Sequence, residues 1–221
     1  MKENNLPEMY EKDDVEAIDR HITKYFGKYD SVFHEIASPD IHVDICIIPP
    51  HDDQDYYILT TMGMGAHQMN VPEELAEYHL ERAELMIALP SDWKLDQESM
   101  QDERWYWPIR LLKSTARLPG EYDTWLGWGH TVAASEGETY ADNTDLCGVL
   151  LLDQIPGGED ASVCRLSGGD EVNFYQLIPL YGEEMDYKCE NNAEALLDLF
   201  DGLSFIVDIN RPNVIEQKME D

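Results

Sequence analysis

The chain carries seven histidines, and its closest approach to a metal-binding or catalytic pattern is His42-x-Asp44. In a strand, residues two apart project from the same face, so these two side chains can share a ligand. Two protein ligands are too few for a metal ion, and any third must come from a distant segment. Candidates for that position are His51, His67, His79 and His130. The polar face of a half-buried strand predicts the same residues without a metal, and we favour that interpretation.

A second kind of chemistry would use histidine as a base. His67 and His130 follow glycine-containing loops, where catalytic groups often lie, and Thr131 adjoins His130 in sequence. A nucleophile–base pair needs contact in space, which adjacency in sequence does not provide. The chain has no G-x-S-x-G, H-E-x-x-H or glycine-rich nucleotide-binding motif. A metal-dependent or histidine-based hydrolase is therefore the alternative hypothesis, and we assign no catalytic, metal-binding or cofactor-binding residue and expect no cofactor.

Two glycine-containing loops and one acidic turn have the composition of a binding surface. Segment 122–130 places two tryptophans, two glycines and a histidine within nine residues. Aromatic residues are enriched at protein interfaces, although tryptophan serves more often in the core. The residues that we predict to contact a partner are Asp52, Asp53, Asp55, Met64, His67, Trp125, Trp128 and His130.

The elements that must position these residues begin with a helix and a hairpin. Apolar residues recur at helical spacing over 15–26, and Gly27 is expected to end that helix. Residues 41–48 alternate as a strand, and 56–61 form its returning partner after a polar turn. Asn70 and Glu73 resemble a capping box, which predicts a helix that runs to about Arg82.

Further along the chain, helices and strands follow one another without regular alternation. We predict a helix from Asp102 to Pro119 and another over 193–200, with strands at 85–89, 146–152, 163–166, 174–180 and 205–209. This order favours an α+β fold, in which helices pack on a mixed, largely antiparallel sheet. No linker divides the chain. We expect a polar leader at 1–12, a single compact domain at 13–214 and a polar tail at 215–221.

The charge of the chain limits its partners. Forty-six acidic and fifteen basic residues give a net charge of −31. This charge repels the nucleic-acid backbone and speeds encounter with a basic protein. No segment approaches the ~20 apolar residues that cross a bilayer, and the acidic N-terminus is unlike a secretory signal. With four widely spaced cysteines, these features predict a cytoplasmic protein that binds neither nucleic acid nor membrane, and they leave its oligomeric state open.

Several longer segments resemble the suppressor-of-fused domain family. They occur in the family's order and together span about residues 30 to 214: ICIIPP (45–50), YYILTTMGMG (56–65), MNVPEE (69–74), RAELMIALP (82–90), WPIRLLK (107–113), YDTWLGWGHT (122–131), CGVLLL (147–152), NFYQLIPLY (173–181) and VDINRPNV (207–214). The resemblance is to a short, bacterial-type, single-domain member.

The resemblance implies a non-enzymatic binding fold. The larger animal relative holds a zinc-finger transcription factor as an added β-strand between two lobes, and this chain resembles only the N-terminal lobe. Short bacterial members resemble immunity proteins that neutralise a toxin. The leading hypothesis is therefore a protein-binding module, an immunity-type inhibitor whose partner is a protein such as a basic toxin domain. A housekeeping scaffold is a further alternative.

Overall fold

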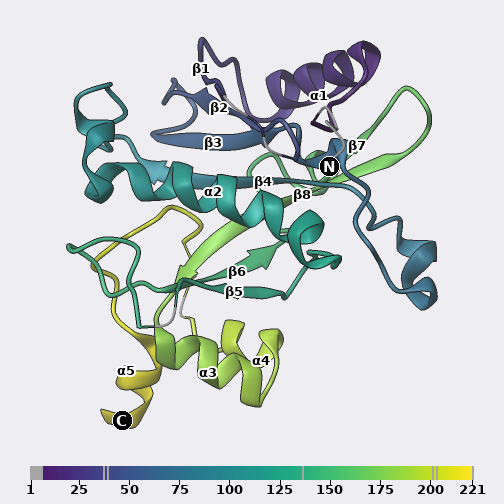
Figure 1. Cartoon of the computed structure of the whole chain (residues 1–221). Coiled ribbons are helices and arrows are strands. Elements are labelled where there is room, and N and C mark those ends of the chain that lie inside the picture. The colour runs from purple at the N-terminus through teal and green to yellow at the C-terminus, as the bar shows by residue number, and fades with distance from the viewer. Residues whose placement is uncertain are drawn as a thin grey trace, which may run out of the picture.

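A computed structural model describes residues 7–36, 38, 40–135, 137–200, 202 and 204–220, without the side chains of residues 219 and 220. Its centre is an eight-stranded sheet of order β1-β2-β3-β4-β8-β6-β5, with β7 paired to β8 beside that path (Figure 1). The strands are β1 (Ser31–Phe33), β2 (Asp44–Ile48), β3 (Tyr56–Met62), β4 (Ala83–Pro90), β5 (Thr131–Ala133), β6 (Gly148–Leu152), β7 (Val163–Arg165) and β8 (Glu171–Leu180). Only β4 and β8 pair in parallel. The predicted α+β fold with a mixed, largely antiparallel sheet is confirmed.

The α-helices cover both faces of the sheet. They are α1 (Lys12–Tyr25), α2 (Glu103–Tyr122), α3 (Gly182–Glu190), α4 (Ala193–Leu197) and α5 (Val214–Glu220). The long helix α2 crosses one face, whereas α1 lies near β7, and α3 and α4 lie beyond β5 and β6 (Figure 1). In the described part of the chain, no helix has both the length and the apolar character needed to cross a bilayer.

Successive side chains of a central strand pack in separate parts of the core, on the two faces of the sheet. In β6, Val149 and Leu151 pack in the cluster that includes α2, whereas Leu150 and Leu152 pack with α4 residues on the opposite face. All five residues of β6 are buried. The continuous apolar run at 146–152 therefore has the cause predicted for it, a strand covered on both faces.

The predicted first helix and hairpin are confirmed. Helix α1 buries Ile18 and Ile22, and Gly27 follows it with a positive φ of 115° that favours glycine. Strands β2 and β3 pair antiparallel, with Ile47 opposite Leu59. The face of β2 that carries Cys46 is also buried, because α1 and its neighbours cover it.

Helix α2 begins as predicted and ends later than predicted. The Asp102 carboxylate accepts a hydrogen bond from the Arg104 N–H, which caps the first turn. Pro119 does not end the helix. A proline ring deprives the helix of only one N–H, and the Pro119 carbonyl still accepts from the backbone N–H of Thr124. The chain turns at Asp123, which has a left-handed φ of 51°.

The predicted helix over 71–82 is wrong. A short 3₁₀-helix occupies Glu73–Tyr78, none of its residues is buried, and His79 ends it with a φ of 52°. The Asn70 side chain donates to the Asp123 carbonyl at 3.4 Å rather than capping a helix. Ala83, directly after the predicted helix, pairs with Asn173 at the start of β4. The capping pattern at Asn70 does not decide the structure here, because the chain must reach the pairing of Ala83 with Asn173, 90 residues further along.

The C-terminal region holds four further differences. Helix α3 was not predicted, because only one of its nine residues, Glu184, is buried and no apolar periodicity marks it. The strand predicted at 205–209 is reduced to a single bridge between Ile206 and Ala88, followed by a turn. The helix predicted over 193–200 is confirmed only as the shorter α4, and the polar segment after Pro212 forms α5.

Candidate functional site

Two of the loops predicted to contact a partner meet near the C-terminal end of α2. The backbone N–H of Asn70 donates to the Thr124 carbonyl at 3.2 Å, and the Leu126 N–H approaches the Met69 sulfur at 3.4 Å. Met69 is itself buried in the core. The segment that follows loop 63–67 is thereby joined to loop 122–130.

Loop 122–130 carries a group of aromatic side chains. The rings of Trp125 and His130 meet edge to face with centroids 4.3 Å apart. Tyr122 is 70% exposed and Trp128 is 37% exposed, so this region presents large apolar side chains to solvent. Burial, and then the nearby charge of Lys188, lower the pKa of His130 below 6.5. Its imidazole is therefore mainly neutral at pH 7 and adds no full charge to the aromatic group.

The same loop leads directly into β5, the last strand at one edge of the sheet. The ladder with β6 includes bonds from the Ala134 N–H to the Cys147 carbonyl and from the Leu151 N–H to the His130 carbonyl. Backbone groups in an antiparallel strand alternate between its two sides. The N–H and C=O groups of Thr131 and Ala133 therefore point away from β6, toward the open edge.

A groove follows this edge between α2 and β5. It consists of two hollows that share the side chains of Leu118 and Val132. One hollow, of about 320 Å³, extends toward Arg110, Thr115 and Tyr140. The other, of about 440 Å³, extends toward the aromatic group and Lys188. In the described part of the chain no strand pairs with the outer side of β5, and this edge lies at the base of a partly apolar groove.

The acidic turn that was predicted to assist binding lies elsewhere. Asp52, Asp53 and Asp55 are exposed in the connection between β2 and β3. This turn precedes β3, and loop 63–67 follows it, so the seven residues of that strand separate them by roughly 23 Å. These carboxylates and the groove belong to different parts of the surface.

Two other residues predicted to contact a partner, Met64 and His67, are less exposed to solvent than expected. Met64 is only 2% exposed and packs in the core beneath α2. The His67 side chain is 25% exposed, and its Nδ1 lies 3.1 Å from the Glu8 carboxylate. The N-terminal segment therefore covers part of the loop.

The histidines of the hydrolase hypothesis are placed in three separate environments. His42 and Asp44 do share a face, with His42 Nε2 3.2 Å from Asp44 Oδ1, and His34 approaches the other oxygen of Asp44 at 2.9 Å. His67 instead contacts Glu8, and His130 contacts Trp125. Within the residues that the structure describes, no three His, Cys, Asp or Glu side chains are arranged to hold a metal ion.

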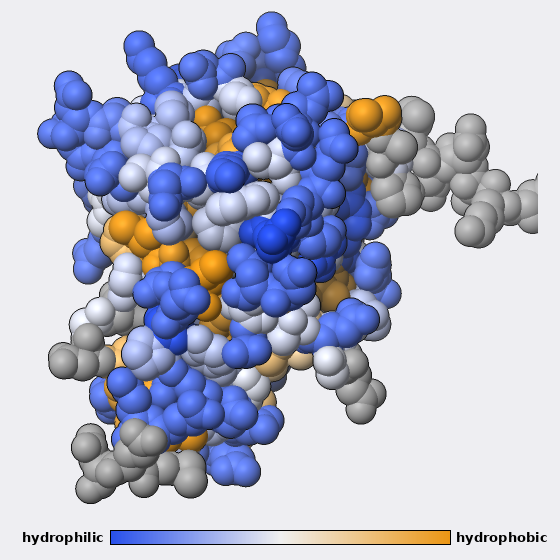
Figure 2. Space-filling view, turned by 90° about the vertical axis from the view of Figure 1, so that its left-hand side faces the viewer, coloured by the Kyte–Doolittle hydropathy of each residue, from blue (hydrophilic) through white to orange (hydrophobic). Residues whose placement is uncertain are grey.

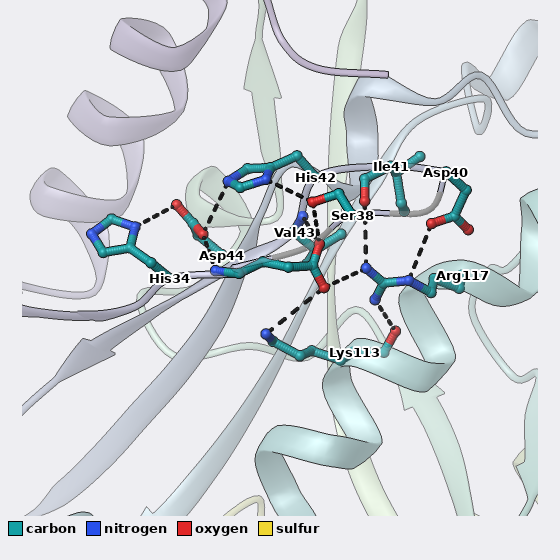
Figure 3. A network of polar contacts seen from close by, with 10 residues as sticks. His34, Ser38, Asp40, Ile41, His42, Val43, Asp44, Lys113 and Arg117 are labelled. Carbon is teal, nitrogen blue, oxygen red and sulfur yellow. Dashed lines mark hydrogen bonds and ion pairs between the residues drawn. The ribbon is translucent and has the colours of Figure 1, made fainter. Parts of the chain in front are cut away.

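The His42–Asp44 pair belongs to a polar network that sequence reasoning missed (Figure 3). At its centre is Glu35, which accepts hydrogen bonds from the Ser38 hydroxyl at 2.8 Å, the Val43 N–H at 3.2 Å and Arg117 at 2.5 Å. Lys113 lies 3.9 Å away. Burial disfavours the Glu35 carboxylate, but these hydrogen bonds and charges outweigh it and lower its pKa. The network joins the segment after β1 to α2.

A second polar cluster is buried inside the sheet. Glu84 of β4 is fully buried and accepts hydrogen bonds from the Tyr10 hydroxyl at 2.8 Å, the Thr61 hydroxyl at 2.5 Å and the N–H groups of Gly63 and Gly65. Burial raises the Glu84 pKa against these four donors. A glutamate within an apolar strand run was the only signal in the sequence. The cluster fixes loop 63–67 and the N-terminal segment, and thereby supports the site from beneath.

Comparisons with known proteins agree with this fold. The sequence model of the family described as suppressor of fused protein (SUFU) matches residues 39–212. An uncharacterized protein of Ureaplasma parvum serovar 3 is 28% identical over 211 residues, which cover 94% of this chain and 98% of that protein.

Solved structures show the same architecture. A chain of the Sufu–Fu complex matches with a TM-score of 0.66 at 14% identity, over 97% of this chain and 96% of that chain. A putative SUFU homolog from Neisseria gonorrhoeae matches at 0.59 and 19% identity, over 92% and 98% of the two chains. Drosophila Suppressor of Fused matches at 0.60 and 14% identity, over 96% of this chain but 54% of its own length.

The earlier resemblance rested on short segments, whereas the family model covers one continuous stretch that includes β2 to β8, α2 and the groove. The chain belongs to the suppressor of fused family.

Proposed function

We propose that this protein is a protein-binding module that takes an extended segment of its partner as an added strand along β5. The observation that carries this proposal is the open edge of β5 at the base of the groove. Its outward N–H and C=O groups offer main-chain hydrogen bonds, and the hollows offer places for side chains. The solved Sufu–Fu complex supports the proposal, because that family member is seen with a partner protein.

The groove also has the amino acids expected of an interface centre. Tyr122, the last residue of α2, lines the hollow of about 440 Å³ and is 70% exposed, and Trp128 in the loop that leads to β5 is 37% exposed. Such side chains supply much of the binding energy at many interfaces because they bury a large area with few rotatable bonds. Trp125 and His130 line the same hollow, with their rings packed edge to face.

The partner that we propose is a basic protein, with a toxin domain neutralised in the cytoplasm as the leading candidate. The support for this is the net charge of −31. Figure 2 shows hydrophilic side chains over most of one face of the molecule, with a smaller apolar area in its middle. A field of this sign accelerates the approach of a basic protein and weakens with added salt.

The test is a proline substitution at the outward-facing position of β5. Ala133→Pro removes an N–H that makes no bond to β6 and leaves the β5–β6 ladder intact. The wild-type protein is used to capture a partner from the cells that produce it, and the identified partner is purified and titrated against both forms. We expect Ala133→Pro to weaken binding by about 100-fold, or about 2.7 kcal/mol.

The matched control is Gly168→Pro, which introduces the same residue in an exposed turn between β7 and β8. It should bind as the wild type does. Hydrogen exchange supplies a second measurement, since the amides of Thr131 and Ala133 should gain protection in the complex. Equal binding by both proline variants, without new protection in β5, would show that the partner uses another surface. A fall in association rate with salt would support a basic partner.

A further inference from the structure

Lys188 is an unpaired cation in a strongly acidic protein. It lies half-buried on α3, and its Nζ is 3.5 Å from the Thr131 hydroxyl of β5. Among the residues that the structure describes, no carboxylate lies within 4 Å of it. Nine other cations form ion pairs, and the remaining described lysines, Lys24, Lys28, Lys94 and Lys218, are exposed; the paired cations are Lys12, Arg20, Arg82, Arg104, Arg110, Lys113, Arg117, Arg165 and Arg211. The chain has three acidic residues for each basic one, and yet this half-buried lysine has no carboxylate near it among the described residues. It is therefore a candidate contact for an anionic group of a partner.

The two sides of β5 present different chemistry to an incoming strand. Val132 pairs with Val149, whose side chain faces α2, whereas Thr131 pairs with Leu150, whose side chain faces α4. Cross-strand partners share a face of the sheet. The hollow of about 440 Å³ reaches around this edge, because Leu118 and Val132 line it on the α2 side and Thr131 and Lys188 line it on the α4 side.

An added strand would meet both sides at once. Its successive side chains point alternately to the two faces of the extended sheet. Residues of one parity would enter the groove beside α2, and a residue of the other parity opposite Thr131 would come beside the Lys188 ammonium. His130 does not compete for an anion there, because burial keeps its imidazole neutral at pH 7.

We propose that β5 selects a partner strand with apolar residues toward α2 and an aspartate or glutamate beside Lys188. This inference rests on the proposed function and specifies its ligand. The contact joins an ammonium to a carboxylate, a charge-assisted hydrogen bond that is stronger than one between neutral groups. A basic partner body and one acidic residue in the inserted strand are compatible, since the net charge acts over about 10 Å and the Lys188 contact acts within 3 Å.

The experiment is selection of peptides from a phage-displayed library of random decapeptides. The baits are the wild-type protein, Lys188→Glu, and Lys12→Glu as the matched control. Lys12 lies on α1, its side chain is 88% exposed, and its substitution changes the net charge by the same amount. Wild type and Lys12→Glu should both enrich alternating apolar residues with one Asp or Glu. Lys188→Glu should instead enrich Lys or Arg at that position.

Binding of synthetic peptides then gives the size of the effect. For a selected acidic peptide, we expect about tenfold weaker binding to Lys188→Met than to the wild type. Near-ultraviolet circular dichroism verifies that each variant is folded. Selected peptides without an acidic preference, or a preference that Lys188→Glu leaves unchanged, overturn this inference while strand addition stands. Failure to select any peptide that protects the β5 amides overturns the proposed function together with it.

Discussion

The two edge strands of the sheet, β1 and β5, lie beside the same helix, α2. They differ in the side chains that α2 presents to each of them. On the β1 side, Lys113 and Arg117 of α2 reach the Glu35 carboxylate, and the Lys113 ammonium lies 4.6 Å from the centre of the Phe33 ring. On the β5 side, Ser114 and Leu118 occupy the next positions around α2 and line the groove. Residues four apart share a helical face, so each edge meets its own stripe of α2.

The contrast shows how one helix can anchor the segment after one edge strand and leave a groove beside the other. An exposed strand edge invites pairing with other chains, and proteins normally cover or shorten it. Long charged side chains hold the segment after β1 against α2 (Figure 3). The shorter side chains facing β5 leave a hollow of about 320 Å³ instead. The open edge thus follows from side-chain choice along α2, and substitutions on the two stripes should have different consequences.

The largest expected effect is loss of the arginine that anchors the segment after β1. Arg117→Met removes bonds to Glu35 and Asp40 and leaves the Glu35 carboxylate, whose side chain is 9% exposed, without its best partner. Unpairing a buried ion pair is costly, and we expect about 3 kcal/mol less stability toward urea unfolding. The amides of β1 should lose hydrogen-exchange protection before those of β5.

Arg110→Met is the matched control on the other stripe of α2. The Arg110 guanidinium pairs with Glu103 at 3.0 Å, but their side chains are 44% and 55% exposed. The guanidinium also donates to the Tyr140 carbonyl at 2.8 Å. An exposed ion pair contributes little and one such hydrogen bond contributes about 1 kcal/mol, so this variant should lose about 1 kcal/mol. If the two arginine variants lost equal stability, the distinction between the anchored β1 side and the β5 side would fail.

A smaller effect should appear in how the stability of the protein depends on pH, because Glu35 lies on the β1 side. The Glu35 pKa is lowered in the folded protein, so its contribution is complete above the unfolded value near 4.5 and is lost as pH falls through the folded value. Glu35→Gln should cost about 2 kcal/mol at pH 7 and should remove this part of the acid dependence. Urea titrations of both proteins between pH 3 and pH 7 measure it. Parallel curves for the two proteins would contradict the role of Glu35.

Much of the fold could be predicted because local periodicity and tertiary packing agree. The apolar spacing of α1, the β2–β3 alternation and the continuous run of β6 each reflect the face or faces that they bury. The segment after Asn70 shows the limit, since a good capping pattern there led to a false helix. Strand pairing between Ala83 and Asn173 decides that region, and a pattern read locally does not contain it.

The candidate site was foreseen only in part, for the same reason. The aromatic loop with Trp125, Trp128 and His130 was recognisable from its composition. The strand β5, however, has three residues, too few to show a period. Lys188 reaches it from a helix 57 residues further along the chain. The Glu35–Arg117 contact likewise spans 82 residues, so only the His42–Asp44 part of that network was visible in sequence.

The smallest effect should have the opposite sign and should occur beside the open edge. The Thr115 hydroxyl lies under the groove on α2, is 1% exposed, and has no hydrogen-bond partner among the described protein groups. Burying an unpaired hydroxyl is unfavourable, so Thr115→Val should raise the stability toward urea by about 1 kcal/mol.

The same substitution at Thr61 provides the contrast. The Thr61 hydroxyl donates to Glu84 and accepts from the Leu85 N–H at 2.8 Å, so both of its roles are filled. Thr61→Val should therefore lower stability, by about 2 kcal/mol. Stability changes of opposite sign in Thr61→Val and Thr115→Val would show that the Thr61 hydroxyl has hydrogen-bond partners within the chain, whereas the Thr115 hydroxyl beside β5 has none. A loss of stability in both variants would mean that the Thr115 hydroxyl also has a hydrogen-bond partner. The proposed contrast between the two regions would then be wrong.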